Sequence, residues 1–149
     1  MILWRISAHL ELDGAGGLLA PARWHTQGSR VVYCALNPAT SLLEVLVHIE
    51  VEPEDLLYPL QYMEIEAPDA LAVEDLDTSA LAQSWRTDLP ATRRAGDRWL
   101  QSSRTALLRV PSVIVPATWN VLINPRNPDS AQIRVIRTLS HGLDPRLFR

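Results

Sequence analysis

The chain has 149 residues, of which 47% are hydrophobic and 21% are charged, and its formal net charge is −3 at pH 7. This length and composition are typical of one globular domain with a hydrophobic core, and the negative charge argues against direct nucleic-acid binding, which depends on neutralised phosphates. The sequence has no stretch apolar enough to cross a bilayer and no signal-peptide pattern at its start, so we expect no membrane association and a cytoplasmic location.

The first third of the chain predicts two strands and one helix. A short strand is expected at 2–6, a glycine-rich turn at 14–17, and a buried strand at 30–36, where β-branched and aromatic residues follow one another. The Asn-Pro pair at 37–38 suits the cap and first turn of a helix, which should end before Pro53.

The rest of the chain predicts further strands and two helices. Residues 57–65 alternate sufficiently for a strand, 78–85 favour a short helix, and 90–103 favour a longer helix with Trp99 facing inward. The last third contains three apolar segments that indicate strands separated by prolines and Asn-Pro turns: VPSVIVP, WNVLINP and AQIRVIRTL. Because the sequence has no repeat or linker, we expect one compact α+β domain over residues 1–149, with a strand-rich core.

Charge is segregated along the chain. Between Val31 and Trp85 there are acidic residues but no arginine, and lysine is absent throughout. Most arginines gather in two groups, at 93–109 and at 134–149. Such groups suit an acidic partner or phosphates, although solvated faces of a domain are the more frequent outcome.

Several familiar signatures are excluded by the sequence itself. The segment GAGGLL at 14–19 has leucine at the last glycine position of the dinucleotide-binding fingerprint, and a chain without lysine cannot form a Walker-type phosphate loop. The four histidines lack paired ligand spacing, so we predict no metal site. Cys34, the single cysteine, excludes an internal disulfide and lies in an apolar strand, where cysteine usually serves as a small buried hydrophobe rather than as a nucleophile.

Four residues remain as the candidate site: Arg23, Tyr33, Glu44 and Ser112. They belong to a pattern that runs through ARWHTQGSRVVYCALNPATSLLEVLVHIE, RVPSVIVPATWNVLINPRNPD and DPRLF. Over these segments, which cover nearly the whole chain, the sequence resembles the RES domain family, named for an arginine, a glutamate and a serine in this order. It departs from the usual family pattern at Ala22 and His25 beside the arginine, and at Asn127, where histidine is usual.

The resemblance implies an enzyme that consumes NAD+. It implies a fold similar to that of ADP-ribosyltransferases, with NAD+ bound in a cleft as a substrate and with no resident cofactor. Cleavage of the bond between nicotinamide and ribose would deplete NAD+ and arrest growth. The protein would then be the toxin of a bacterial toxin–antitoxin pair, in which a genetically adjacent Xre-like antitoxin covers the cleft and a toxin dimer forms part of a larger complex.

The four residue types also suit this reaction on physical grounds. The ribose carbon passes through an oxocarbenium-like transition state, so a carboxylate such as Glu44 would stabilise the growing positive charge. The guanidinium of Arg23 can hold phosphate oxygens bidentately, and the ring of Tyr33 can stack on nicotinamide or a ribose. Ser112, expected at a strand start after Pro111, can hydrogen-bond the substrate phosphate or orient Glu44.

Glu44 has a structural interpretation beside the functional one. Ser41 and Glu44 match a capping box, in which Glu44 would only close the start of a helix. If Asn37 caps the helix instead, Glu44 lies inside it and needs a partner or a function. Spacing alone supports the two interpretations equally, and the resemblance favours the second.

The other candidates are individually ordinary. Taken singly, Arg23 suits a loop cation, Tyr33 a core residue and Ser112 a turn residue after a proline. Asn120 and Asn124 flank a predicted strand and are interpreted as turn formers, with contact between Asn120 and the cleft as the alternative, and both are left out of the site.

Three functions from two classes follow. The first is degradation of NAD+ with water or phosphate as the acceptor, and the second is transfer of ADP-ribose to a protein target by the same site. The third is an inert module that binds an antitoxin-like partner through its arginine-rich faces. The complete set of four site residues argues against the third, because a module without activity has no need of them.

Overall fold

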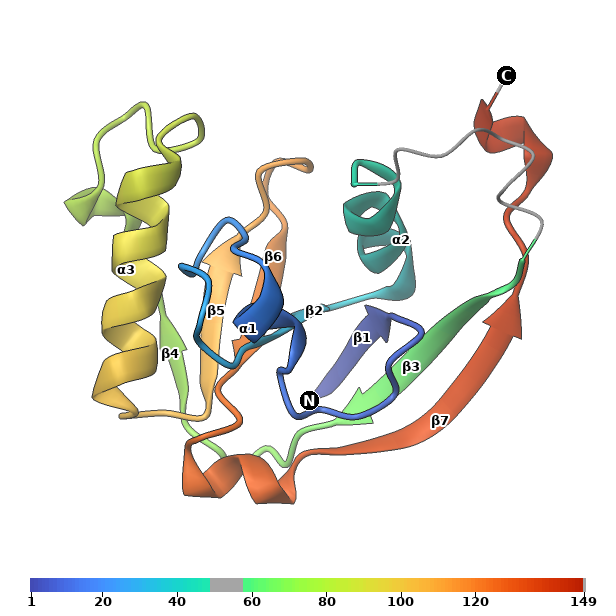
Figure 1. Ribbon diagram of the computed structural model, residues 1–149, viewed down its shortest axis with the longest axis horizontal. Helices are drawn as coiled ribbons and strands as arrows, with labels where there is room; N and C mark the ends of the chain where they lie inside the picture. Colours follow the sequence, from blue (N-terminus) through green and yellow to red (C-terminus); the bar gives the residue numbers. More distant parts are fainter. Residues whose placement is uncertain (49–57, 149) are drawn as a thin grey trace.

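A seven-stranded sheet forms the centre of the molecule in the computed structural model, which describes residues 1–48 and 58–148 (Figure 1). The strands are β1 (Ile2–Ile6), β2 (Val32–Ala35), β3 (Leu60–Glu66), β4 (Val73–Asp75), β5 (Leu107–Pro111), β6 (Trp119–Ile123) and β7 (Arg134–His141). The helices are α1 (Gly16–Leu19), α2 (Pro38–Leu46) and α3 (Leu89–Ser102), with 3-10 turns η2 (Thr78–Ala80), η3 (Pro128–Gln132) and η4 (Pro145–Phe148). The predicted α+β class is confirmed.

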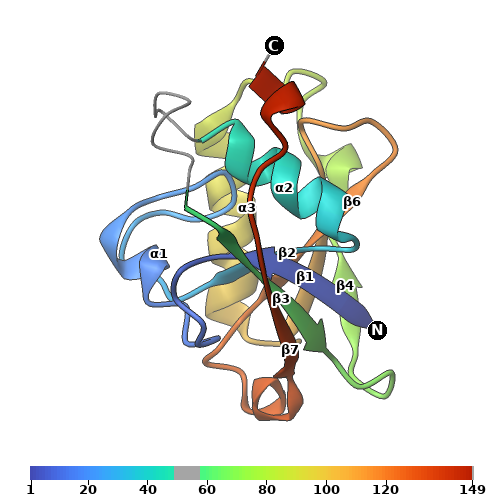
Figure 2. The same cartoon turned by 90° about the vertical axis from the view of Figure 1, so that its right-hand side faces the viewer.

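The order of the strands is β4-β5-β6-β2-β1-β3-β7, and only β4 and β5 are parallel. The β1 and β2 strands are joined by a single register pair, Trp4 with Ala35. By contrast, β1 pairs with β3 along its whole length, and β3 pairs with β7 in the same way. Two well-paired parts of the sheet therefore meet at β1 and β2, and β3 and β7 lie side by side at the outer edge (Figure 2).

Alternating apolar side chains bury both faces of the sheet, because successive strand residues point to opposite sides. One core contains, among others, Leu3, Val32, Met63, Leu107, Val121 and Ile123. The second core, on the other face, contains Trp24, Val31, Trp85, Trp99, Leu108, Val110 and Leu122. The position of Trp99 in the second core confirms the prediction that this residue faces inward.

The α2 and α3 helices lie over the same face of the sheet. Trp99 of α3 packs in the second core with Val110. Val110 is paired with Asn120 across β5 and β6, and paired residues point to the same face. Because Glu44 of α2 contacts the side chain of Asn120, α2 covers this face too. Figure 1 shows the two helices on either side of β5 and β6.

The start of α2 decides between the two interpretations of Glu44. The side chain of Asn37 accepts a hydrogen bond from the backbone N–H of Thr40 at 2.8 Å, and Pro38 opens the helix. The Asn37 cap is therefore confirmed, the capping box at Ser41 is wrong, and Glu44 lies inside the helix. The helix ends at Leu46, and Pro53 lies outside the described residues.

Several predicted elements are confirmed with small shifts at their ends. The strand at 2–6 matches β1, the strand at 30–36 contains β2, and the helix at 90–103 matches α3 within one residue. The strand predicted at 57–65 is β3, which runs from Leu60 to Glu66, and residue 57 lies outside the described residues.

Other elements differ from the prediction. The glycine turn continues into one helical turn, α1. The helix predicted at 78–85 is only the three-residue η2, because Leu81 is extended and Trp85 packs against Trp24 with 5.8 Å between ring centroids. The segment VPSVIVP is not one strand, since β5 ends at Pro111 and a turn follows. The short strand β4 was not predicted.

The segregated charges of the sequence meet across neighbouring elements. Acidic residues of β3 and β4 pair with arginines that come later in the chain, in Glu64–Arg137, Glu66–Arg134, Glu74–Arg104 and Asp75–Arg109. Exposed pairs such as these contribute about 0–1 kcal/mol each. Several arginines of each group are therefore already paired with acidic residues of the same domain. No helix in the described part of the chain has the length and hydropathy of a membrane span.

Candidate active site

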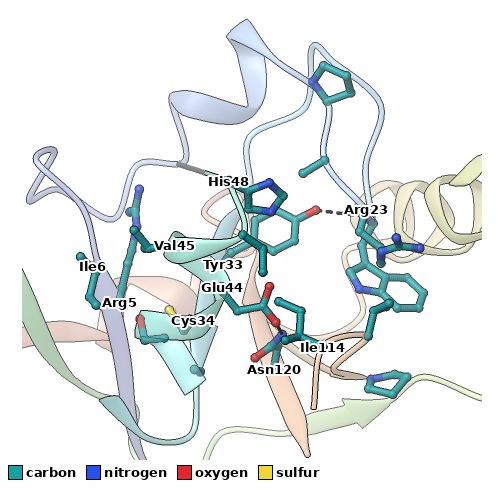
Figure 3. A pocket seen from close by; sticks show the side chains of 18 of the residues that line it. Arg5, Ile6, Arg23, Tyr33, Cys34, Glu44, Val45, His48, Ile114 and Asn120 are labelled. Carbon is teal, nitrogen blue, oxygen red and sulfur yellow. Dashed lines mark hydrogen bonds between the residues drawn. The ribbon is translucent and has the colours of Figure 1, made fainter. Parts of the chain in front are cut away.

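A pocket of about 700 Å³ opens on the helix-covered face of the sheet (Figure 3). Its walls come from the loop before β2, from strands β1, β2 and β6, from α2, from the start of α3 and from the turn after β5. Three of the four predicted site residues line it: Arg23, Tyr33 and Glu44. The fourth, Ser112, contacts Glu44. The fold therefore brings together residues that lie far apart in the sequence.

Glu44 is the one carboxylate among the described residues that line the pocket. Its Oε1 accepts a hydrogen bond from Nδ2 of Asn120 at 2.6 Å and another from the hydroxyl of Ser112 at 3.3 Å. Its Oε2 accepts no hydrogen bond from the described residues. This oxygen is also not fully buried. One oxygen is thus held by two neutral donors, and the other is open to the pocket.

Ser112 lies directly after β5 and not at a strand start, which corrects the prediction. The reason is local, because its Oγ accepts hydrogen bonds from the backbone N–H groups of Ile114 and Val115, both at 3.2 Å, and these bonds turn the chain. The hydroxyl proton is then directed to Glu44. Of the two roles proposed for this 3%-exposed serine, contact with Glu44 is the one present here.

Tyr33 presents its ring to the pocket while its hydroxyl is engaged behind it. The oxygen accepts a hydrogen bond from the backbone N–H of Trp24 at 3.1 Å and lies 2.9 Å from Nδ1 of His25. Burial raises the pKa of the Tyr33 hydroxyl well above its usual value, although the hydrogen bond from the Trp24 N–H opposes the shift. The phenol stays protonated, and its ring is the part left for a substrate.

Arg23 lines the pocket on the side opposite Glu44 (Figure 3). Its Nη1 donates to the backbone carbonyl of Arg86 at 2.9 Å, which fixes the direction of the side chain. The loop that carries it is held by Arg93 of α3, whose Nε donates to the carbonyl of Ala22 at 2.9 Å. Gly96 of the same helix lets this loop approach closely, because a Cβ at that position would collide with the carbonyl of Trp24.

The pocket also contains residues that the sequence reasoning did not select. Arg5, Arg93 and His48 join Arg23 along its walls. Burial lowers the pKa of the Arg5 guanidinium from its usual value, and the group remains a cation at any physiological pH. Asn120, interpreted from the sequence as a turn former, instead lies within β6 and contacts Glu44. Among the described residues, the pocket thus combines several cations with one carboxylate.

A group of possible metal ligands lies outside this pocket. His9, Glu11 and Asp13 bring ligand atoms within 4.8 Å of one another, and Nε2 of His9 already hydrogen-bonds Asp13 at 2.9 Å. All three belong to an exposed or partly exposed loop, and nothing else in the described residues points to an ion there. That the protein acts without a bound metal ion therefore stays a prediction.

The fold of the chain has a counterpart among solved structures. Its fold is similar to that of a chain in the crystal structure of the M. tuberculosis MbcT–MbcA toxin–antitoxin complex, with a TM-score of 0.72 and 17% sequence identity over 98% of this chain and 85% of that one. This likeness shows the fold, a small α+β domain built on one mixed sheet.

The chain belongs to the RES domain family, whose model matches residues 2–144. It is 45% identical over 148 residues to a Pseudomonas putida protein named Toxin Res, covering 99% of this chain and 100% of the relative. It is also 39% identical over 157 residues to a Sphingobium protein named Prs ADP-ribosylating toxin, covering 98% of this chain and 96% of the relative. The resemblance predicted from the sequence is confirmed, and the chain is a toxin of this family.

Proposed function

We propose that the protein cleaves the bond between nicotinamide and ribose in NAD+ and that this activity makes it toxic. The observation that carries the proposal is the position of Glu44, with one oxygen held and the other open, in a largely apolar pocket that also contains an aromatic ring and several arginines. A pocket of about 700 Å³ is in the range that accommodates ligands of this size.

The chemistry of the bond suits a carboxylate of this kind. When the C1′–N bond breaks, nicotinamide leaves with the electron pair as a neutral base, and positive charge grows on the ribose ring. The open Oε2 of Glu44 would stabilise that charge in the transition state or hydrogen-bond a ribose hydroxyl. A water or phosphate oxygen then bonds to C1′ and, where water attacks, releases its proton to solvent or to Glu44.

The remaining residues of the pocket would bind and orient the dinucleotide. Arg23, with Arg5 and Arg93 on neighbouring walls, offers guanidinium groups to the pyrophosphate oxygens. The ring of Tyr33, fixed through its hydroxyl, offers a rigid face for nicotinamide or a ribose. Holding both ends of the substrate would place the glycosidic bond against Glu44. Ser112 would act through Glu44 rather than on the phosphate.

A second function uses the same first step and differs in the acceptor. Transfer of ADP-ribose to a protein also begins with cleavage at C1′, and one relative is named an ADP-ribosylating toxin. The inert-module alternative is disfavoured, because the site residues meet in one pocket and many of the arginines on which it relied are paired within the domain.

We also propose that an antitoxin covers the pocket. A similar fold occurs in a toxin–antitoxin complex, and the cations at the rim would favour acidic or polar residues of a Xre-like partner, with one of them meeting Arg23. We propose a toxin dimer within the larger complex on the family resemblance alone. Coexpression of the adjacent gene product, followed by light scattering of the purified complex, measures both the partner and the stoichiometry.

The direct test incubates the purified chain with NAD+ and measures nicotinamide release by chromatography, with and without phosphate. We expect release by the wild type, loss of more than about a hundredfold in Glu44→Gln, and a raised KM in Arg23→Ala. ADP-ribose or its 1″-phosphate identifies water or phosphate as the acceptor. Transfer of label from NAD+ to a protein in lysate would favour the second function, and no release with folded wild type would overturn the proposal.

The same variants test the link to toxicity in cells. Under tight induction, intracellular NAD+ should fall before growth stops, and neither change should occur with Glu44→Gln. Growth arrest at constant NAD+ would contradict NAD+ depletion as its cause. Exposed Arg126→Ala serves as a matched control for Arg23→Ala, because Arg126 does not line the pocket.

A further inference from the structure

Asn120 holds the carboxylate of Glu44 more closely than any other described residue does. It lies in β6, opposite Ala35 of β2 and Val110 of β5, so its side chain points to the face that carries the pocket. Its Nδ2 lies 2.6 Å from Oε1 of Glu44, compared with 3.3 Å for the hydroxyl of Ser112. Figure 3 shows the two side chains of Asn120 and Glu44 pointing toward each other.

The other end of the same amide is left without a partner. Among the described residues, Oδ1 of Asn120 is the one buried side-chain oxygen or nitrogen that makes no hydrogen bond. A buried unpaired carbonyl destabilises a fold, since it has lost its bonds to water and gained none. Native structures contain few such groups, and each requires an explanation. Stability of the sheet does not explain Asn120, because an apolar residue at this position would avoid the cost.

We propose that Asn120 is a positioning residue for the catalytic carboxylate, an inference that rests on the proposed function and deepens it. The amide donates to Oε1 and thereby sets the direction in which Oε2 of Glu44 faces the substrate. Only one orientation of the Asn120 amide gives a hydrogen bond to Glu44, because a flipped amide would place Oδ1, an acceptor, against the carboxylate oxygen. Oδ1 is thus left unpaired, at a cost in fold stability, because Nδ2 of the same amide is directed to Glu44.

Two different elements deliver the two donors to one oxygen. Asn120 comes from the sheet beneath α2, and Ser112 comes from the turn after β5. A neutral amide and a neutral hydroxyl hold the carboxylate in place without adding a positive charge beside it, whereas an arginine would add one. No cation bound to Glu44 then competes with the positive charge that develops on the ribose in the transition state.

The matched comparison is with Asn124, a second buried asparagine just after β6. Both ends of its amide are used, since Nδ2 donates to the carbonyl of Leu100 at 3.2 Å and Oδ1 accepts from the backbone N–H of Arg126 at 3.1 Å. Asn124 does not line the pocket. A purely structural asparagine should resemble Asn124, and a positioning residue should differ from it in a predictable way.

The experiment measures kcat, KM for NAD+ and the melting temperature of Asn120→Ala, Asn120→Asp and Asn124→Ala. For Asn120→Ala we expect kcat to fall about tenfold to a hundredfold, the range for one hydrogen bond to a charged group. We expect KM within about twofold and a melting temperature equal to that of the wild type or higher. Asn120→Asp, which places a second carboxylate against Glu44, should lose more kcat than Asn120→Ala. Asn124→Ala should lose stability and keep kcat.

A further measurement reports the contact without any turnover. In amide NMR spectra, the side-chain signals of Asn120, assigned from their loss in Asn120→Ala, should lie downfield in the wild type and move upfield in Glu44→Gln. Unchanged kcat in Asn120→Ala, with Glu44→Gln inactive, would overturn the positioning role and leave the proposed function in place. Full activity of Glu44→Gln would overturn both. Loss of stability in Asn120→Ala equal to that in Asn124→Ala would reduce Asn120 to a structural residue.

Discussion

The hydroxyl of Tyr33 lies 2.9 Å from Nδ1 of His25, and this contact joins strand β2 to the loop that carries Arg23. Nε2 of the same ring lies 3.0 Å from the carbonyl of Ala20, which can only accept a hydrogen bond. Nε2 therefore carries the proton, and Nδ1 accepts one from Tyr33. The neutral imidazole thus fixes both the aromatic wall of the pocket and the loop beside it.

The first prediction concerns the pH dependence of stability through His25. Burial, the largest cause, lowers the pKa of His25 below its ordinary value of 6.5, although nearby carbonyls and Asp97 oppose the shift. The unfolded chain then binds more protons than the folded one just below pH 6.5. The stability that the neutral ring contributes is present in full above this pH and is lost as the pH falls toward the lowered value.

We therefore expect the melting temperature of the wild type to fall more steeply between pH 7 and pH 5 than that of His25→Asn, which lacks a titratable ring. The slopes are compared and not the absolute values, because asparagine also loses packing. His9, His48 and His141 are present in both proteins, so their titration cancels. Parallel slopes would show that His25 does not titrate differently in the folded state.

The second prediction concerns the contact between α3 and the loop of Arg23. A Cβ on Gly96 would overlap the backbone carbonyl of Trp24, which cannot move without shifting Arg23. Gly96→Ala should therefore destabilise the protein by about 1–3 kcal/mol, the usual cost of overpacking, and raise KM for NAD+. Gly142→Ala is the control, because an added Cβ there meets nothing within 4 Å. Equal denaturant midpoints for the two variants would contradict this account.

The elements that sequence patterns predicted well are those in which local signals agree. The Asn37 cap, Pro38 and the stripe of apolar residues all indicate α2, and the structure has this helix with that cap. The residues at 78–85 gave a weaker signal, and packing of Trp85 on Trp24 determined their structure instead. The short edge strand β4 depends on pairing with β5, which comes more than thirty residues later and cannot be seen locally.

The candidate site could likewise be predicted only in part, because some of its contacts depend on residues far apart in the sequence. Arg23, Tyr33, Glu44 and Ser112 were found because the family pattern marks them together. Asn120 was considered for the cleft but left out of the site, since one asparagine at the edge of an apolar run is more often a turn former. Alternation was the available signal: Val121 and Ile123 share one face of β6, which places Asn120 with Leu122 on the other. Which residue it meets depends on the register between β6 and β2, and only the fold supplies that.

The third prediction concerns the single cysteine. Cys34 is 4% exposed, as predicted from its strand, and burial raises the pKa of its thiol to about 12. The thiolate that a nucleophile requires is therefore scarce at neutral pH. We expect Cys34 of the native protein to resist thiol reagents, to react after unfolding, and to be replaceable by alanine with less than about a twofold change in kcat. Rapid modification with loss of activity would instead support a nucleophilic role.

The fourth prediction separates Ser112 from Asn120. The hydroxyl of Ser112 satisfies two backbone N–H groups, those of Ile114 and Val115, in addition to its bond to Glu44. Ser112→Ala leaves both N–H groups without this acceptor in a partly buried turn, which costs about 1–3 kcal/mol. It also removes one of the two donors to Glu44, so both the free energy of unfolding and kcat should fall.

Urea denaturation and NAD+ turnover, measured on the same preparations, test this difference. Exposed Ser140→Ala is the control, since its hydroxyl contacts only the side chain of Gln61 among the described residues. We expect Ser112→Ala to lose stability and turnover together, Asn120→Ala to lose turnover alone, and Ser140→Ala to lose neither. If Ser112→Ala kept the stability of the wild type, the turn after β5 would be maintained by other contacts. The serine would then act only through Glu44, as Asn120 does.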